Sequence, residues 1–270
     1  MSDTIQADLG FLVPTKQKPV YFASQGGAAA ELNIAARITP KTVTIADARE
    51  ISPAPTLDKE GFALVSHCSS VTDFYDDAQI RDIYEREIRS LVQEVTGASH
   101  VVVFDNTRRS DATAIRGARN TREPSAVVHN DYTDESARKR LRDILGDEAE
   151  ERLQHRFAII NVWRSIGGPV LTTPLALCDA SSALESDLVA TERRAKDRIG
   201  ELQLVTYNPG QRWYWFSGLT KDEAILLKTF DSDQSGRARR SIHTAFANPA
   251  APPDAQPRES IETRTLAFFD

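Results

Sequence analysis

The sequence of 270 residues contains only two cysteines, Cys68 and Cys178, which lie far apart in the chain. Neither belongs to a Cys-x-x-Cys pair, so nothing supports a zinc ribbon or a thioredoxin-like site. No apolar run reaches about 18 residues, and no basic segment precedes an apolar stretch near the first residue. We therefore expect no membrane partner and a cytoplasmic protein whose thiols are reduced.

An excess of positive charge is also missing. Lysine and arginine total 33 against 39 aspartates and glutamates, which leaves a formal net charge of −6. This balance argues against a nucleic-acid partner, because nucleic-acid binding normally requires a basic face. Hydrophobic residues make up 40% of the chain and charged residues 27%. Such a composition is typical of a globular protein that is long enough to bury a sizeable core.

Periodicity of the apolar residues predicts a few helices. Between residues 77 and 96 they recur at three- and four-residue spacing, which indicates an amphipathic helix that Gly97 ends. Thr133 or Asp134 is suited to cap a second helix. We expect an extended arm over residues 1–30, a loop over 110–124 and partly helical structure over 183–198.

Strands are predicted mostly in the second half of the chain. Short apolar or alternating runs indicate them at residues 42–45, 62–65, 101–104, 156–164, 175–178, 202–207, 213–216, 224–230 and 260–269. The tripeptide Asn208-Pro209-Gly210 is suited to a hairpin turn between two of them. The predicted fold is mainly β with flanking helices (α+β), built on a barrel or sandwich core.

One short stretch combines a histidine and a carboxylate. His129 and Asp131 follow two valines and are two residues apart. On a strand such residues project from the same face, roughly 6–7 Å apart, so both side chains can reach one ion. His243, in the later stretch Ser241–Phe246, is the best candidate for a third ligand. Two histidines and one carboxylate form the facial triad of non-haem Fe(II) oxygenases.

A candidate carboxylate clamp follows the second histidine. Arg258 and Ser260 lie two residues apart, before an alternating segment that reads as a terminal strand. An arginine can grip a carboxylate with two parallel hydrogen bonds, and a serine hydroxyl can add a third. Arg264 on the same segment is the alternative to Arg258. The sequence thus predicts a metal site and, later in the chain, a binding site for a carboxylate.

The order His129-x-Asp131, His243 and Arg258-x-Ser260 resembles the Fe(II)/2-oxoglutarate-dependent oxygenase superfamily. Further stretches resemble a hydroxylase/desaturase group of bacterial and fungal secondary metabolism, which includes relatives of the cephalosporin 7α-methoxylation proteins. These stretches are Asn161–Arg164, Pro174–Asp179, Tyr207–Pro209 with Trp213-Tyr214, Phe230–Ser232 and Ser241–Phe246. The resemblance runs from about Gly61 to the C-terminus, and it implies a double-stranded β-helix (jelly-roll or cupin-like) core.

The resemblance also implies a reaction and its cofactors. Fe(II) would be held by His129, Asp131 and His243, and 2-oxoglutarate and O2 would be the co-substrates, with succinate and CO2 as products. A small-molecule secondary metabolite would be hydroxylated, desaturated or oxidatively cyclised, depending on which carbon is positioned closest. Asp131 is absent from the related halogenases, so its presence favours hydroxylation or desaturation over halogenation.

We expect a single oxygenase domain over residues 1–270. It would comprise an N-terminal arm and first strands (1–60), a helix-containing part (61–126) and the metal-binding β-helix core (127–270).

Several assignments remain open at the level of sequence. Trp163, Arg164 and Arg108, with Arg109 beside it, are candidates for substrate binding, and Tyr207 for a contact with the cofactor. A metal-dependent hydrolase or isomerase on a cupin-like barrel could use the same three ligands without needing Arg258 and Ser260. A non-catalytic accessory protein of the same fold is a further alternative. The chain could act as a homodimer or beside a partner enzyme.

Overall fold

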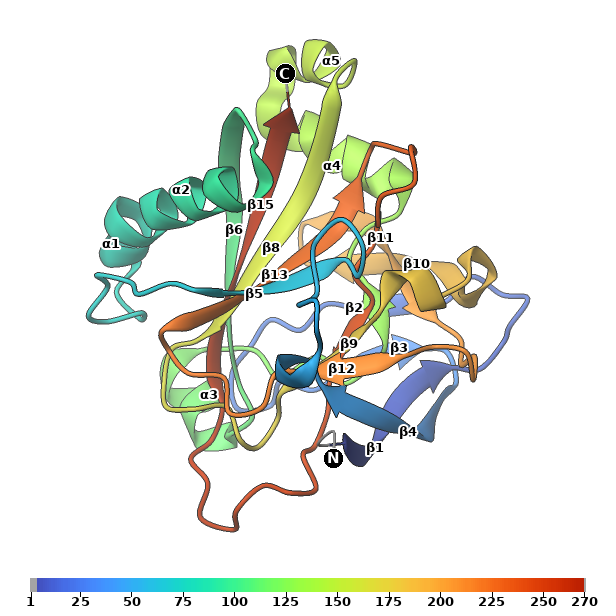
Figure 1. Cartoon of the computed structure of the whole chain (residues 1–270), viewed down its shortest axis with the longest axis vertical. Coiled ribbons are helices and arrows are strands. Elements are labelled where there is room, and N and C mark those ends of the chain that lie inside the picture. The colour runs from blue at the N-terminus through green and yellow to red at the C-terminus, as the bar shows by residue number, and fades with distance from the viewer. Residues whose placement is uncertain (1–3, 270) are drawn as a thin grey trace.

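Two β-sheets face each other in the computed structural model, which describes residues 4–269 (Figure 1). In sheet order, the larger consists of β1 (Thr4–Leu12), β4 (Ile38–Asp47), β12 (Trp213–Trp215), β9 (Leu175–Cys178), β14 (His243–Ala245), β7 (His129–Asn130), β11 (Arg198–Val205), β10 (Leu188–Ala195), β2 (Val20–Phe22) and β3 (Asn33–Ala35). The smaller consists of β5 (Phe62–Ser66), β13 (Glu223–Asp231), β8 (Arg156–Ser165), β15 (Glu259–Phe269) and β6 (His100–Ser110). The predicted mainly β class is confirmed.

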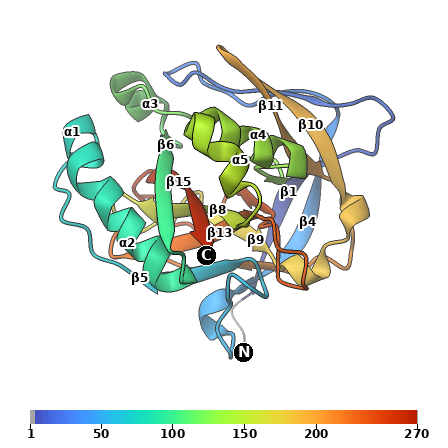
Figure 2. The same ribbon diagram turned by 90° about the horizontal axis from the view of Figure 1, so that it is seen from above.

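The predicted helix over residues 77–96 is confirmed as one continuous element. It consists of α1 (Asp77–Gln79), the π-helical segment η2 (Ile80–Tyr84) and α2 (Glu85–Thr96). Gly97 ends it with a φ of 72°, and its N–H donates to the Gln93 carbonyl at 2.8 Å. The apolar side of this helix packs on the outer face of the smaller sheet (Figure 2).

Two other helices lie at one end of the space between the sheets. Thr133 caps α4 (Asp134–Leu145) in a capping box with Ser136, as the sequence predicts, and α5 (Ala149–Arg152) follows. Leu141 on α4 packs against Phe157, Ile159 and neighbouring side chains of the smaller sheet. The remaining helix, α3 (Thr113–Arg119), and the 3-10 turns η1 (Ala48–Glu50), η3 (Gly146–Glu148), η4 (Ala180–Ser182) and η5 (Glu185–Asp187) are short.

The strand predicted over residues 156–164 is β8, and its burial on both faces explains why its sequence is so apolar. Nine of its ten residues are buried, and its side chains alternate between two cores. Ile160 and Val162 face the core beneath α2, whereas Ile159 and Trp163 face the interior of the molecule. The interior cluster of Trp163 also contains Leu175 and Leu177 of the larger sheet, so this core joins the two sheets. The strand therefore sets which side chains can point towards a site between the sheets.

The structure differs from the local predictions in four places. The expected N-terminal arm contains strand β1, which pairs with β4 along its whole length (residues 1–3 lie outside the described part). The expected loop 110–124 contains α3. The segment 183–198 is helical only in the 3-10 turn η5 and otherwise consists mostly of β10. Because only part of β10 is buried, the strand contains many charged residues, and these suggest a solvated helix. The strands joined by the Asn208–Gly210 turn are not neighbours, since β11 pairs with β10 and β7 whereas β12 pairs with β4 and β9.

Candidate metal centre

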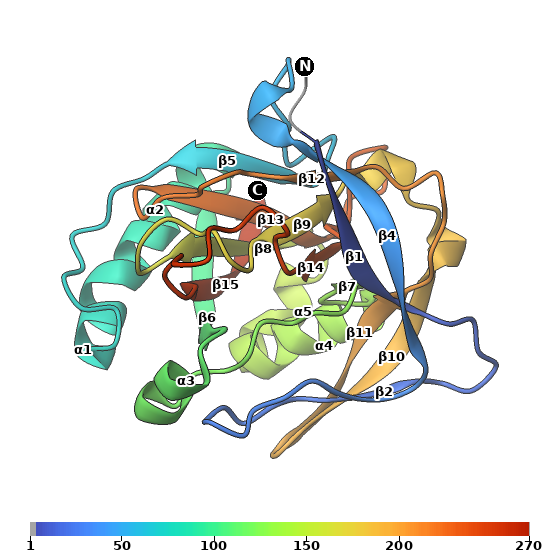
Figure 3. The same cartoon turned by 90° about the horizontal axis from the view of Figure 1, so that it is seen from below.

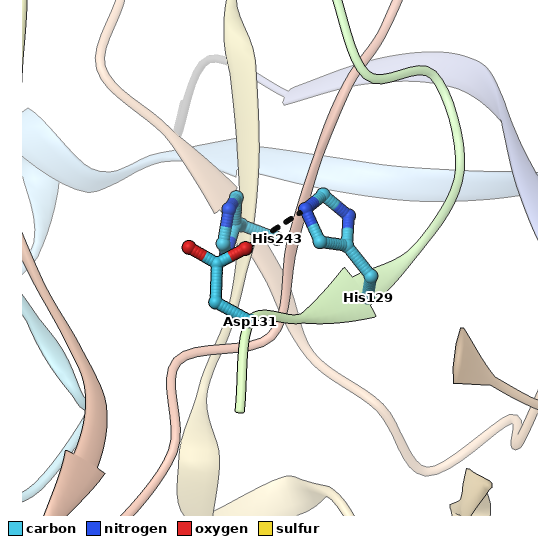
Figure 4. A group of neighbouring side chains, drawn as sticks. All are labelled: His129, Asp131 and His243. Atoms are coloured by element: carbon cyan, nitrogen blue, oxygen red, sulfur yellow. Dashed lines mark ion pairs between the residues drawn. The ribbon is translucent and has the colours of Figure 1, made fainter. Parts of the chain in front are cut away.

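His129 and His243 lie opposite each other on two paired strands in the middle of the larger sheet (Figure 3). Directly opposed residues of an antiparallel pair have side chains close enough to touch. Their ring centroids are 4.5 Å apart. Asp131 follows the last residue of β7, and one potential ligand atom from each of the three residues lies within 4.8 Å of the others (Figure 4). The structure thus brings together the three predicted metal ligands.

Both imidazole rings are fixed by the same backbone contact. Nδ1 of His129 lies 2.7 Å from the Val127 carbonyl, and Nδ1 of His243 lies 2.8 Å from the Ser241 carbonyl. A carbonyl oxygen can only accept, so each Nδ1 must donate, and each Nε2 is left with a free lone pair. Both rings are therefore already held in an orientation that leaves Nε2 available to bind a metal ion.

The carboxylate of Asp131 is held through one of its oxygens. Oδ2 accepts hydrogen bonds from the Asn161 amide at 2.7 Å and from Nε of Arg264 at 3.2 Å. Oδ1 lies 3.6 Å from Nε2 of His129, within the group of potential ligand atoms. One oxygen is therefore available for a cation, while the other is fixed by its neighbours.

Arg264 and Glu262 extend this network on β15. The Arg264 guanidinium donates to Asp105 at 2.6 Å and to Glu262 at 2.5 Å, in addition to its contact with Asp131. Glu262 also accepts from Asn161 at 2.9 Å. Arg264 is thus surrounded by three carboxylates. It orients a metal-ligand candidate and has little capacity left to bind the carboxylate of a cofactor.

The electrostatics of the site favour metal binding. Burial, reinforced by the neighbouring His243, lowers the pKa of His129 to about 3, so this ring is neutral near pH 7. Burial alone would raise the pKa of Asp131, but the charge of Arg264 and the two histidines hold it well below its usual range. A neutral imidazole and an ionised carboxylate are the protonation states that a metal ion requires.

Arg258, which directly precedes β15, and Ser260 on β15 form a second polar group. Nε of Arg258 donates to the Ser260 hydroxyl at 3.1 Å, and Nη1 donates to the Thr173 carbonyl at 2.8 Å. The guanidinium also lies 4.8 Å from the ring of Trp163. Arg258 is only 2% exposed and forms no ion pair with any carboxylate among residues 4–269. Burial, together with the charge of Arg109, lowers the pKa of Arg258 to about 9.

The two candidate clamps cannot serve the same carboxylate. Arg258, the residue before β15, and Arg264 on that strand are six residues apart, so in extended chain their Cα atoms are roughly 20 Å apart. Arg264 contacts a metal-ligand candidate, whereas Arg258 contacts the segment that precedes β9. Of these two arginines, Arg258 is the one whose guanidinium has no acidic partner among residues 4–269.

The structure places two of the candidate substrate-binding arginines away from the metal ligands. Arg164 is 1% exposed and lies on the opposite face of β8 from Trp163, where it donates to the His67 carbonyl at 2.8 Å and lies 5.8 Å from the ring of Tyr84. Arg108 donates to Asp77 at 2.8 Å beside α1. Alternation along β6 and β8 turns both side chains away from the metal ligands. They contact instead the region of the continuous helix α1–η2–α2, which packs on the outer face of the smaller sheet.

The prediction for Tyr207 is also not supported by its contacts. Its side chain is 41% exposed, packs edge-on against Phe11 at 5.3 Å and lies beside Lys41. Arg109, which the sequence offers beside Arg108, does reach the site: with His129 it lines a small hollow of about 30 Å³.

Sequence reasoning gave no role to several residues around the ligands. Asn161 has a usable signal, because it is a buried amide within an otherwise apolar strand and must find hydrogen-bond partners. Glu262 has a weaker signal, since it alternates with apolar residues on the terminal strand. Arg122 and Arg193, which lie beside the ligands, have none, because they come from segments that read as a solvated loop and helix.

Two imidazole nitrogens and one carboxylate oxygen, with the remaining positions open, are the donor set of the non-haem Fe(II) oxygenases. The comparisons with known proteins agree with this class. A family model described as an oxidoreductase/YMDC permease-like domain matches residues 9–268. The hydroxylase/desaturase CTB9 of Cercospora beticola is 36% identical over 256 residues, which cover 85% of this chain and 77% of that protein. The Fe(II)/2-oxoglutarate-dependent dioxygenase nvfI of Aspergillus novofumigatus is 34% identical over 240 residues, covering 85% and 84%.

A solved structure has the same fold. The iron and alpha-ketoglutarate-dependent endoperoxidase NvfI superposes with a TM-score of 0.85 at 29% identity, and the match covers 98% of both chains. The chain therefore belongs to the Fe(II)/2-oxoglutarate-dependent dioxygenase family, and its core is the double-stranded β-helix of that family. Fe(II) is the cofactor of this family, 2-oxoglutarate and O2 are its co-substrates, and the substrate is a small molecule. Among residues 4–269, no helix is long and apolar enough to cross a membrane.

Proposed function

We propose that His129, Asp131 and His243 hold the iron of this oxygenase and that Arg258 and Ser260 bind the distal carboxylate of 2-oxoglutarate. When bound, iron and 2-oxoglutarate supply the oxidising power: O2 and 2-oxoglutarate are converted to succinate and CO2, and one oxygen atom is left for the substrate. The chain's own part is to bind, orient and shield these reactants.

The buried guanidinium of Arg258 is the observation that carries the cofactor assignment. A buried charge without a partner is costly, and the free-energy cost falls when an ionised carboxylate binds to it. Ser260 adds a hydroxyl at 3.1 Å from Nε of Arg258, and the Trp163 ring covers the guanidinium. These groups suit the binding of a carboxylate. A metal-dependent hydrolase or isomerase with the same three ligands would not need such a binding site.

The proposed reaction is hydroxylation or desaturation of a secondary metabolite, or its oxidative cyclisation. Support comes from relatives named hydroxylase/desaturase in Cercospora beticola and Hormonema carpetanum, and from a relative named endoperoxidase. The hydrogen bonds from Asn161 and Arg264 would keep Asp131 in one orientation during turnover.

We also propose that the chain is a single domain in the cytoplasm, possessing no nucleic-acid or membrane partner and working as a homodimer or beside a partner enzyme. The single domain is supported by the ten-stranded sheet, which contains β1 and β4 as well as the strands of the metal ligands. The location is supported by Cys68 and Cys178, both of which are free. The state of assembly is measured by light scattering of the purified chain.

The first test is anaerobic addition of Fe(II) and 2-oxoglutarate to the metal-free protein, followed by visible absorption. We expect a weak metal-to-ligand charge-transfer band in the wild-type protein and no band in His129→Ala. Binding of metal without a band would favour the hydrolase or isomerase instead. Absence of metal binding would show that the assignment of the three ligands is wrong.

A further inference from the structure

An arginine-lined pocket adjoins the metal-ligand candidate Asp131. The cavity has a volume of about 230 Å³ and is bounded by residues of β6, α4, β10 and β11 as well as by Asp131 itself. Figure 2 shows α4 between β6 and the β10–β11 pair. The small hollow beside His129 shares Asp131, Arg122, Arg193 and Arg264 with it, so the pocket leads to the metal centre.

Four arginines of this pocket have no acidic partner. Arg122, Arg140, Arg193 and Arg198 are half-buried, and none forms an ion pair within the described part of the chain. Arg140 stacks on Phe104 at 4.7 Å, but its Nε is buried without a hydrogen-bond partner. By contrast, half-buried Arg156 pairs with Asp231 at 2.7 Å and half-buried Arg240 pairs with Asp134 at 3.0 Å. Four arginines without an ion pair therefore gather around this one cavity.

The arginines also repel one another. Burial lowers the pKa of Arg122, and the charges of Arg109 and Arg193 add to this effect. Burial likewise lowers the pKa of Arg193 and Arg198, with contributions from Arg264 and from Arg140, respectively. Placing like charges together in a partly desolvated pocket costs free energy, which a bound anion would recover.

The acidic residues near the pocket are already engaged. Asp105 pairs with Arg264, Asp143 with Lys139, and Glu201 with Lys18. Asp131 belongs to the metal-ligand group. Glu123 in the small hollow is the exception: it is buried, and its Oε2 has no hydrogen-bond partner. Positive charge is still in excess, because the pocket is lined by six basic and four acidic side chains.

We propose that this pocket binds an oxyanionic group of the substrate, so that the metabolite oxidised at the metal centre is an acid carrying a carboxylate, sulfate or phosphate. Arginine is the side chain best suited to such groups, because its planar guanidinium can donate two parallel hydrogen bonds to them. Anchoring the charged group in a pocket that adjoins Asp131 would hold the rest of the substrate near the metal. This inference rests on the proposed function and names the substrate class for it.

The test measures binding and not turnover. Sulfate and phthalate, an aromatic dicarboxylate, are titrated into the full-length protein by calorimetry, with chloride at matched ionic strength as the blank. The titration is done with metal-free protein and again anaerobically with Fe(II) and saturating 2-oxoglutarate. Variants Arg193→Gln and Arg198→Gln remove pocket charges. Arg194→Gln is the matched control, because Arg194 is the next residue on β10 but is exposed and pairs with Glu192.

We expect saturable binding of at least one of the two anions to the wild type and to Arg194→Gln. Affinity should fall about tenfold in Arg193→Gln and in Arg198→Gln, as is usual when a charge-assisted hydrogen bond is lost. Tighter binding of phthalate would indicate a carboxylate substrate, and tighter binding of sulfate would indicate a sulfate or phosphate ester.

Three results would overturn the inference. The first is the lack of anion binding beyond the chloride blank, and the second is binding that Arg193→Gln and Arg198→Gln leave unchanged. The third is loss of anion binding when 2-oxoglutarate is present, because the arginines would then belong to the co-substrate site. None of these results would affect the charge-transfer band of the wild-type protein, so failure here is distinguishable from failure of the proposed function.

Discussion

Arg264 donates a hydrogen bond to Oδ2 of Asp131 at 3.2 Å, whereas Oδ1 of Asp131 lies 3.6 Å from Nε2 of His129. The same guanidinium bonds to Asp105 and Glu262, so the arginine is fixed in position by other carboxylates. The carboxylate of Asp131 thus stays ionised and oriented before any cation arrives. Four predictions follow from this arrangement and from the rest of the structure.

Arg264→Lys should weaken Fe(II) binding about 10- to 100-fold, the usual effect of losing a partner that orients a metal ligand. Lysine keeps the charge but cannot reproduce the guanidinium fork that reaches three carboxylates. The measurement is anaerobic titration with Fe(II). Arg237→Lys, at an exposed ion pair with Asp233, is the control. Unchanged iron affinity in a folded Arg264→Lys protein would contradict the role given to Arg264.

His129→Ala and His243→Ala should each abolish iron-dependent decarboxylation of 2-oxoglutarate. Each change removes an Nε2 that the backbone carbonyl contact at Nδ1 leaves free for the metal. Release of labelled CO2 from 2-oxoglutarate measures the effect. His155→Ala serves as the control because His155 is exposed. Full turnover in either ligand variant would be incompatible with the assignment.

Arg258→Ala should raise the KM for 2-oxoglutarate about tenfold or more, because a charge-assisted pair with a carboxylate is lost. The affinity for Fe(II) should stay the same, since Arg258 does not contact the three ligands. Ser260→Ala should have a smaller effect of the same kind.

Thermal unfolding gives an independent check on Arg258. 2-Oxoglutarate should raise the melting temperature of the wild type more than that of Arg258→Ala, because the variant binds it less tightly. Equal stabilisation of both proteins, with an equal KM, would rule out Arg258 as the clamp.

Thr133→Ala should lower the free energy of unfolding by about 1 kcal/mol, the usual effect of losing an N-cap. The Thr133 hydroxyl accepts from the Ser136 N–H at 3.0 Å and donates to Glu201 at 3.0 Å. Urea denaturation followed by circular dichroism measures the change. Thr133→Ser keeps the hydroxyl and should retain most of the stability. A serine variant as unstable as the alanine variant would show that the methyl group, not the cap, matters.

The strands and the outer helix were predictable because their signals are local. Ile80, Ile83, Ile88, Leu91 and Val92 repeat with helical spacing, and their apolar side packs on the sheet as expected. The errors fall where local pattern and tertiary context disagree. Arg193 and Arg194 suggest a solvated helix, yet they lie on strand β10, where the pairing with β11 and β2 determines the structure.

The sequence by itself determined the candidates at the centre of the molecule: two histidines, a carboxylate and a later arginine–serine pair, in an order that resembles the Fe(II)/2-oxoglutarate-dependent oxygenases. This was possible because few metal ions suit that set of ligands, and because the order of such short motifs can be followed along the chain. Only the tertiary structure decided where each arginine side chain points and whether it has an acidic partner. Strand alternation turns Arg164 outward and Arg109 inward, and ion pairing engages Arg264 while leaving Arg258 without an acidic partner among the described residues. The direction and the ion pairing of an arginine depend on neighbours that are distant in the chain, and these neighbours cannot be identified from one sequence.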